Sequence, residues 1–264
     1  MSLFLAAVEY GGPWHLPPVN ELFEWPAFLF QDTIFAFNRV ALLSLLAAVI
    51  AAVLFLIAFN KPKIVPGKFQ AACEAVVDFI RDQIALQAMG SDGLRFVPLL
   101  TTIFLFVWMN NLFEILPFIN FPPTSRMAIP AFLTAVVYVL YHFFGVKAQG
   151  LGGYLKNTLF PPGAPKALYI LLTPIEIIQA FVSRPLTLAV RLFANMLAGH
   201  IILTLIFITI HAFLVFGPGL PVGLGALIAS PLLVGFELVV GLLQAYIFTI
   251  LTAVYIGGSL HPEH

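Results

Sequence analysis

The chain has 264 residues, of which 61% are hydrophobic and only 9% are charged, and its 12 basic and 12 acidic residues cancel. A soluble domain of this size carries about 25% charged residues, so this chain must use lipid as the solvent for much of its surface. The balanced charge gives no sign of a nucleic-acid partner. No basic stretch precedes the first apolar run, which Glu9 interrupts, so we expect no cleaved signal peptide. The composition excludes an ordinary soluble enzyme.

The N-terminal part of the chain predicts an arm followed by a first membrane helix. Residues 1–33 are rich in Pro, Trp and Glu and contain no Lys or Arg, which indicates an arm outside the membrane or at its interface. We expect a helix at 34–59, because most of that stretch is an uncharged run that nearly spans a hydrocarbon core of about 30 Å. Lys61, Lys63 and Lys68 follow at once and mark this end as cytoplasmic.

Residues 69–89 are predicted to form an amphipathic helix that lies along the membrane interface. Apolar side chains recur at helical spacing on one face, while Glu74, Asp78, Arg81 and Asp82 take the other face. An ordinary soluble helix is the alternative, and a position between two membrane spans disfavours it.

Two further membrane helices are expected at 95–118 and 128–146. The first carries Glu114 and two asparagines near its far end. The glycine-rich stretch after the second helix contains Lys147 and Lys156, and we interpret it as a cytoplasmic loop.

Two long apolar segments, 168–216 and 222–258, complete the chain, and a Gly-Pro-Gly-Leu-Pro turn separates them. As helices they would be about 73 and 55 Å long, so either each is steeply tilted or the first crosses twice. The lysines gather on one side of the membrane, and Arg126 is the basic residue of the opposite loops. Five crossings then place the N-terminus outside and the C-terminus in the cytoplasm. The predicted fold is an all-α polytopic membrane protein with one membrane domain, residues 34–264.

Two arginines stand in apolar surroundings in the first long segment. An arginine at mid-membrane costs at least about 2.5–3.5 kcal/mol, and because it keeps its charge it needs an anion or water. For Arg184, which precedes Pro185, a snorkelling or salt-bridged side chain is as good an interpretation as a functional one. For Arg191 a functional role is the better interpretation. Thr187 and Asn195 lie four residues either side of Arg191 and extend a polar stripe along one helix.

The second long segment offers Glu237 and Gln244, which are seven residues apart and therefore on one helical face. A hairpin that turns near Gly219 pairs His200 with Glu237 and Arg191 with Gln244 in the same register. His200 and Glu237 would make a proton relay, because histidine titrates near neutral pH and a buried glutamate can hold a proton. A fixed pair that only satisfies two buried groups is the alternative.

The run from Arg184 to His200, RPLTLAVRLFANMLAGH, resembles subunit a of the F-type ATP synthase membrane sector. The stretch Leu243–Tyr255 looks like the C-terminal helix of that family, and NLFEILP at Asn111–Pro117 is also similar. The resemblance covers residues 95–258 well. It implies a multi-pass protein of the bacterial plasma membrane whose two long helices lie tilted, as a hairpin, against a ring of c-subunits. Its other partners would be subunit b of the peripheral stalk and the remainder of the synthase.

The resemblance also implies roles for individual residues. Arg191 matches the family's essential arginine, which faces the ring carboxylates, and Glu176 matches an acidic position near the cytoplasmic half-channel. Glu114 matches an acidic or polar position of unassigned role, and Thr187 of the polar stripe is a further candidate for the pathway. The positions that match the outer half-channel are Asn195, His200, Glu237 and Gln244.

These roles predict a mechanism. A ring carboxylate is stable in lipid only when it is protonated, and its charged form is favoured beside Arg191. Arg191 would therefore release a proton from the arriving site and prevent direct passage between two half-channels, so the ring must turn. The expected function is a proton-conducting stator subunit with no ATP-forming or ATP-hydrolysing site and no cofactor on this chain.

Three alternatives stay open beside this one. The same role with Na⁺ is one, because ion choice lies largely on the ring subunit. A secondary ion-coupled transporter is another, although neither internal repeats nor broken helices are visible. An intramembrane metalloenzyme is the third, but His200, His211 and Glu237 lack a compact ligand spacing.

Overall fold

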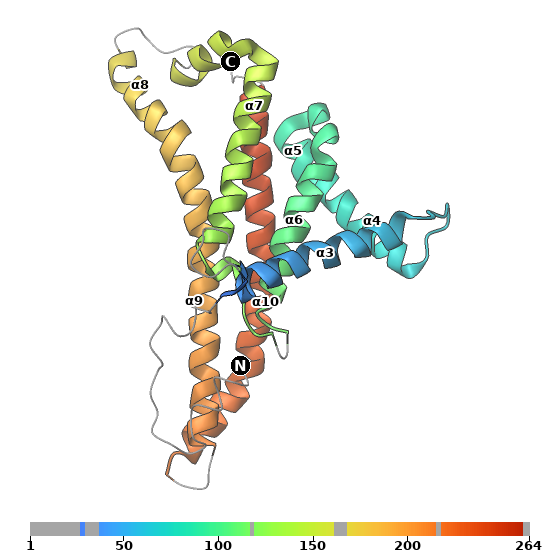
Figure 1. Ribbon diagram of the computed structural model, residues 1–264, viewed down its shortest axis with the longest axis vertical. Helices are drawn as coiled ribbons and strands as arrows, with labels where there is room; N and C mark the ends of the chain where they lie inside the picture. The colour runs from blue at the N-terminus through green and yellow to red at the C-terminus, as the bar shows by residue number, and fades with distance from the viewer. Residues whose placement is uncertain (1–26, 30–36, 117–118, 161–167, 215–217, 261–264) are drawn as a thin grey trace. The chain divides into compact units, whose positions relative to one another are not determined.

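A computed structural model of the chain describes residues 27–29, 37–116, 119–160, 168–214 and 218–260 (Figure 1). Five helical runs in this part of the chain are long and apolar enough to span a membrane, which confirms the expected all-α polytopic fold. These runs are Arg39–Phe59, Lys68–Leu112, Ala128–Leu159, Tyr169–Phe213 and Leu220–Leu260.

The first helix, α3, covers Arg39–Phe59 and begins five residues later than the sequence predicts. A short strand β2 at Phe37–Asn38 precedes it and pairs antiparallel with β1 at Ala27–Leu29. The Asn38 side-chain oxygen accepts a hydrogen bond from the backbone N–H of Ala41 at 3.1 Å. This N-cap fixes the start of the helix. The rest of the predicted N-terminal arm lies outside the described residues.

The second run is helical throughout but changes its winding. Its pieces are α4 (Lys68–Ile80), the π-helix η1 (Arg81–Ala85), α5 (Leu86–Met89), the 3₁₀-helix η2 (Gly90–Phe96) and α6 (Val97–Leu112). The amphipathic segment is therefore helical, and its placement along the interface stays a prediction. Helix α6 ends at Leu112 rather than at 118. The backbone N–H of Glu114 there donates to the Asn111 carbonyl at 3.1 Å, which tightens the chain into a turn.

After the 3₁₀ turn η3 (Pro123–Ser125), helix α7 runs from Ala128 to Leu159 with a break at Gly150. The predicted loop after residue 146 was wrong, since this stretch is helical on both sides of the break. Gly150 has φ 74°, a left-handed conformation that glycine adopts without strain. Tyr154 then packs against Gly145, where an added Cβ would lie 2.7 Å from Cδ2 of the Tyr154 ring. The glycines thus shape a helical corner.

The first long segment consists of α8 (Tyr169–Ile178), the π-helix η5 (Gln179–Ser183) and α9 (Arg184–Phe213), which Figure 1 shows as one continuous run. No turn interrupts this run, so the interpretation in which it crosses the membrane twice was wrong. The backbone N–H of Arg184 donates to the Gln179 carbonyl, five residues back. This wider turn comes directly before Pro185, whose ring cannot fit a regular α-turn without a local adjustment.

The last helix, α10, covers Leu220–Leu260 and contains Pro231. It folds back on the end of α9 at two glycines. An added Cβ at Gly223 would lie 2.6 Å from the backbone carbon of Phe213, and one at Gly219 would meet the Phe213 ring. The expected hairpin is therefore present, and small residues let it close.

The chain divides into two compact units. Unit 1 consists of residues 1–50, 106–129 and 193–244, and unit 2 consists of 51–105, 130–192 and 245–264. The divisions fall inside helices, including α3, α6, α9 and α10. The core of unit 1 includes Val40, Leu43, Ala47, Phe113 and Phe121.

Candidate functional site

Unit 1 contains a buried polar cluster contributed by α6, α9, α10 and the turn after α6. Glu114, His200 and Glu237 are no more than 5% exposed. The Asn111 amide donates to the Gly241 carbonyl at 3.0 Å, which ties α6 to α10 one helical turn from Glu237. The Glu114 carboxyl is close enough to the Glu237 carboxyl to interact with it electrostatically. Two carboxyl groups and a histidine are therefore buried in the same unit.

The hairpin places the residue before His200 against Glu237, while a pairing of His200 itself with Glu237 stays a prediction. The neighbouring Gly199 faces Glu237 directly, since an added Cβ would lie 2.6 Å from its carboxyl carbon. The imidazole of His200 packs edge-on against the Phe121 ring, with centroids 5.5 Å apart. The glycine lets the Glu237 carboxyl lie against the backbone of α9.

Several polar atoms of this cluster are buried and lack a hydrogen-bond partner within the described residues. They are Oε1 of Glu114, Nδ2 of Asn195 and Oε2 of Glu237. Buried polar groups in proteins are nearly always paired, so unpaired ones call for a functional explanation. Carboxyl oxygens that can take up and release a proton have the chemistry of a proton path.

Further polar contacts surround this cluster at the start of α3 and the end of α6. The Ser44 hydroxyl donates to the Asn110 amide oxygen at 2.9 Å, and the Thr124 hydroxyl donates to the Asn111 amide oxygen at 2.6 Å. These side chains fix the two asparagines. The predicted pair of Arg191 and Gln244 joins residues of different units and stays a prediction.

Arg191 lies exposed on helix α9. Thr187, Ala194 and Ala198 are exposed at four-residue or three-residue steps on the same helical face, so the arginine stands among small side chains. Among the residues that the structure describes, Arg191 makes no ion pair. A charge of this kind inside a membrane needs an anion or water beside it.

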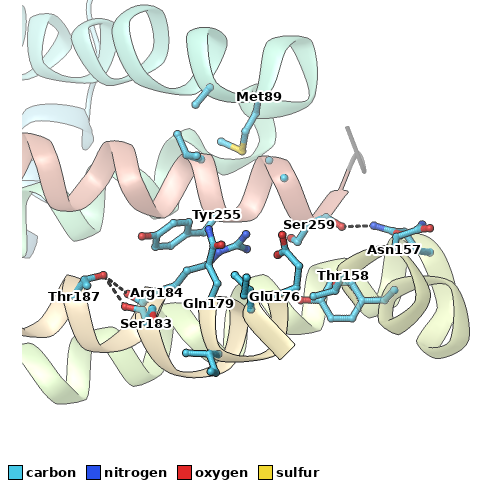
Figure 2. A pocket seen from close by; sticks show the side chains of 18 residues that line it. Met89, Asn157, Thr158, Glu176, Gln179, Ser183, Arg184, Thr187, Tyr255 and Ser259 are labelled. Carbon is cyan, nitrogen blue, oxygen red and sulfur yellow. Dashed lines mark hydrogen bonds between the residues drawn. The ribbon is translucent and has the colours of Figure 1, made fainter. Parts of the chain in front are cut away.

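Unit 2 contains a cavity of about 1020 Å³ (Figure 2). Its polar lining comes from α7, α8, η5, α9 and α10, and includes Gln149, Asn157, Glu176, Gln179, Arg184, Thr187 and Ser259. The Gln149 amide donates to the Ser259 carbonyl at 2.7 Å, and the Thr187 hydroxyl donates to the Ser183 carbonyl at 2.7 Å. Two predicted pathway residues, Glu176 and Thr187, therefore line one space.

Arg184 shares this cavity with Glu176 (Figure 2). Its guanidinium carbon lies 5.7 Å from the centre of the Tyr255 ring, within the range of a cation–π contact. It forms no ion pair in the described ranges, so the salt-bridge interpretation of Arg184 finds no support. The cavity therefore holds a carboxyl group and a separate fixed cation.

The described residues include no group of three or more His, Cys, Asp or Glu side chains placed to hold a metal ion. His200, His211 and Glu237 are not such a group, and nothing in the described parts of the chain favours the metalloenzyme alternative.

Comparison with known proteins decides the family. The profile described as "ATP synthase A chain" matches residues 41–257. The chain belongs to this family. It is 41% identical to "ATP synthase subunit a" of Rhodococcus erythropolis, an alignment that covers 98% of this chain and 94% of the relative. It is 41% identical to the protein of that name from Frankia alni, over 94% and 87% of the two chains. For the one from Gluconacetobacter diazotrophicus the identity is 39%, over 83% and 87%.

Membership of the ATP synthase A chain family confirms the resemblance from the sequence, and the chain is an integral membrane protein. The seven predicted site residues all lie inside the matched range. Sequence reasoning missed the cavity residues Gln149, Tyr154 and Asn157, because their segment was interpreted as a loop. Tyr154 and Asn157 are three residues apart, a helical spacing that could have indicated a shared face.

Proposed function

We propose that this chain is the proton-conducting stator subunit of an F-type ATP synthase, with two offset half-channels and an arginine that couples proton flow to the rotation of a c-ring. Its partners are the c-ring, subunit b of the peripheral stalk and the rest of the synthase. The nucleotide chemistry resides on other subunits.

The observation that carries this proposal is the position of Arg191. It lies exposed on a face of small side chains, it has no ion pair among the described residues, and α9 is apolar around it. A permanent cation here is compensated when a carboxylate on a partner arrives beside it. A ring of carboxylates that pass one at a time supplies such a partner repeatedly.

The buried cluster of unit 1 is the outer half-channel in this proposal. His200 and Glu237 exchange protons, and Asn195 and Gln244 carry the path towards the ring. Glu114 takes part as a further carboxyl group, because its carboxyl interacts electrostatically with that of Glu237. A relay through closely packed groups moves protons and excludes larger ions.

The cavity of unit 2 is the inner half-channel. Gln149 and Asn157 come from the segment that carries Lys147 and Lys156, and positively charged segments mark the cytoplasmic side. Ser259, near the end of α10, also belongs to this cavity, so the C-terminus is cytoplasmic and five crossings leave the N-terminus outside. The membrane is the bacterial plasma membrane.

The mechanism follows from these two paths. A proton that enters through unit 1 neutralises a ring carboxylate, which can then move into lipid. After nearly a full turn the carboxyl group reaches the inner path, where Arg191 favours its charged form and the proton leaves past Glu176. Arg191 also blocks direct passage, because a proton cannot cross a fixed positive charge easily.

The test is ATP-driven proton uptake into membrane vesicles that contain the whole synthase. Arg191→Ala should abolish pumping while ATP hydrolysis by the detached soluble sector persists, and Arg191→Lys should be a poor replacement, because a lysine is a strongly hydrated point charge. Arg95→Ala, at an exposed arginine, is the matched control. Normal pumping by Arg191→Ala would overturn the mechanism. Pumping that requires Na⁺ would assign the same role with sodium.

A further inference from the structure

A histidine borders the cavity of unit 2 behind the residues that line it. His142 of α7 is surrounded by four aromatic rings. The Tyr141 and Tyr138 ring centres lie 4.3 and 4.4 Å from its own. Phe181 of η5 stacks on the imidazole at 5.3 Å with an interplanar angle of 10°, and Tyr154 approaches edge-on at 5.6 Å. We call these four rings the aromatic box.

Tyr154 connects His142 to the cavity. Its side chain is 5% exposed and lines the cavity, and its hydroxyl oxygen lies 2.7 Å from Nδ1 of His142. At this distance the phenol and the imidazole share a hydrogen bond, whose donor depends on the tautomer. A chemical path therefore runs from the cavity, through one hydroxyl group, to an imidazole.

The other ring nitrogen of His142 is not satisfied. Its Nε2 atom is buried and has no hydrogen-bond partner within the described residues. A buried ring nitrogen without a partner costs free energy. If the side chain served packing alone, an apolar ring could fill the aromatic box without that cost. The unpaired nitrogen favours a role that needs an imidazole.

The charged and titratable groups around His142 come from three helices. Tyr138, Tyr141 and Tyr154 belong to α7, Arg184 of α9 is close enough to act on His142 electrostatically, and Tyr255 of α10 packs on Tyr141 with centroids 6.0 Å apart. No carboxylate forms an ion pair with His142 in the described ranges. The aromatic faces attract a proton on His142 and Arg184 repels it.

We propose that His142, joined to the cavity through Tyr154, is a proton-carrying residue of the inner path. The inference rests on the proposed function, because it requires that protons pass through this cavity. With Nδ1 unprotonated, the Tyr154 hydroxyl gives its proton to Nδ1 while its oxygen takes a proton from a hydronium ion in the cavity. The phenol is restored, one water is left, and His142 gains one proton and one positive charge. The reverse steps return the proton.

This arrangement raises the chance of proton capture when protons are scarce. During ATP-driven pumping the ring takes up protons from the inner side, and at alkaline pH that uptake becomes slow. The neutral imidazole of His142 accepts a proton that reaches the cavity and passes it on to the route past Glu176 and Arg184. Its contribution is therefore largest at high pH, where proton uptake limits the rate, and smallest at low pH, where hydronium ions are plentiful.

The experiment measures ATP-driven pumping by the whole synthase in vesicles, as a function of pH on the cavity side. His142→Gln keeps the size and hydrogen bonding of the side chain but cannot titrate. We expect pumping near the wild-type rate at about pH 6 and about tenfold slower at about pH 8, a smaller loss than a positioned acid–base group usually gives, because water can replace part of the relay. Tyr154→Phe should show the same profile, and the double variant should be no slower.

Matched controls separate this effect from a loss of structure. His211→Gln and Tyr246→Phe make the same chemical changes outside the aromatic box and should keep the wild-type pH profile. An equal loss for His142→Gln at every pH, or no loss at all, would overturn the proposal. If either His142 or Tyr154 variant fails to assemble, ¹⁵N NMR of histidine-labelled wild-type synthase decides: a His142 resonance that keeps one protonation state between about pH 5 and 8 overturns it.

The two proposals fail in different ways. An unchanged profile for His142→Gln together with inactive Arg191→Ala removes His142 from the path and leaves the proposed function standing. Normal pumping by Arg191→Ala removes the coupling mechanism whatever the behaviour of His142.

Discussion

The two units of this chain carry similar numbers of acids but very different numbers of bases. Two of the 12 basic residues, Arg39 and Arg126, lie in unit 1 and ten lie in unit 2, while the 12 acidic residues divide equally. A chain that is neutral as a whole is thus acidic in one half and basic in the other. Since basic residues tend to stay on the cytoplasmic side, the difference supports the proposed orientation of the protein.

The polar groups of the two units also differ in packing. In unit 1 they lie against one another and against glycine, as Glu237 does with Gly199. In unit 2 they line a space of about 1020 Å³ (Figure 2). A closely packed path depends on the geometry of each member, whereas an open path tolerates change because water can replace a group. Substitutions should therefore act more severely in unit 1.

The largest effect that follows from this comparison is expected at Gly199. Gly199→Ala puts a methyl group against the Glu237 carboxyl and should destabilise the α9–α10 packing by about 1–3 kcal/mol, the usual cost of overpacking. We expect a strong loss of pumping. The measurement is pumping per assembled complex, with assembly followed on native gels.

Gly225→Ala is the matched control for that change. Nothing lies within 4 Å of a Cβ added at Gly225, which lies on α10, the helix that carries Glu237, so this substitution should be neutral or slightly stabilising. Equal behaviour of the two alanine variants would show that the packing around Glu237 is not tight.

A smaller effect is expected for His200 and Glu237. Each single replacement, His200→Glu or Glu237→His, should slow pumping partially, and the double exchange should restore more activity than either change alone. The physical reason is that both residues serve one relay in one hairpin register. A double-mutant cycle of pumping rates measures the coupling, and simple additivity would show that the pair does not act together.

The smallest effect is expected from a label at the C-terminal end. Cysteine introduced at Pro262 should leave pumping unchanged and should react with a membrane-impermeant maleimide from the cytoplasmic side of inverted vesicles. The basic residues of unit 2 are the reason for this expectation. Labelling from the outer side alone would reverse the orientation inferred from the charge difference. Cys73 is buried, and its replacement by Ala removes the native thiol as a background.

Much of the fold could be predicted because membrane helices need long apolar runs, and the hairpin of α9 and α10 followed from the position of one turn. The helical corner after residue 146 could not be predicted, since Gly150, Gly152 and Gly153 are as typical of a loop as of a kinked helix. The cavity was missed for the same reason. It forms only when α7 turns at Gly150 and places Tyr154 and Asn157 opposite Glu176.

The π-turn at Gln179–Ser183 has a consequence for how the distance from Glu176 to Arg191 should be counted. The two residues are 15 positions apart in the sequence, and one wide turn lies between them. A π-turn accommodates one residue more than an α-turn, so the loss of one residue there could convert it into a regular turn and leave every later side chain on its original face. The sequence spacing between acid and arginine can therefore change by one residue during evolution while the arginine keeps its orientation. Related chains should therefore be compared by the number of helical turns between this acid and this arginine rather than by the number of residues.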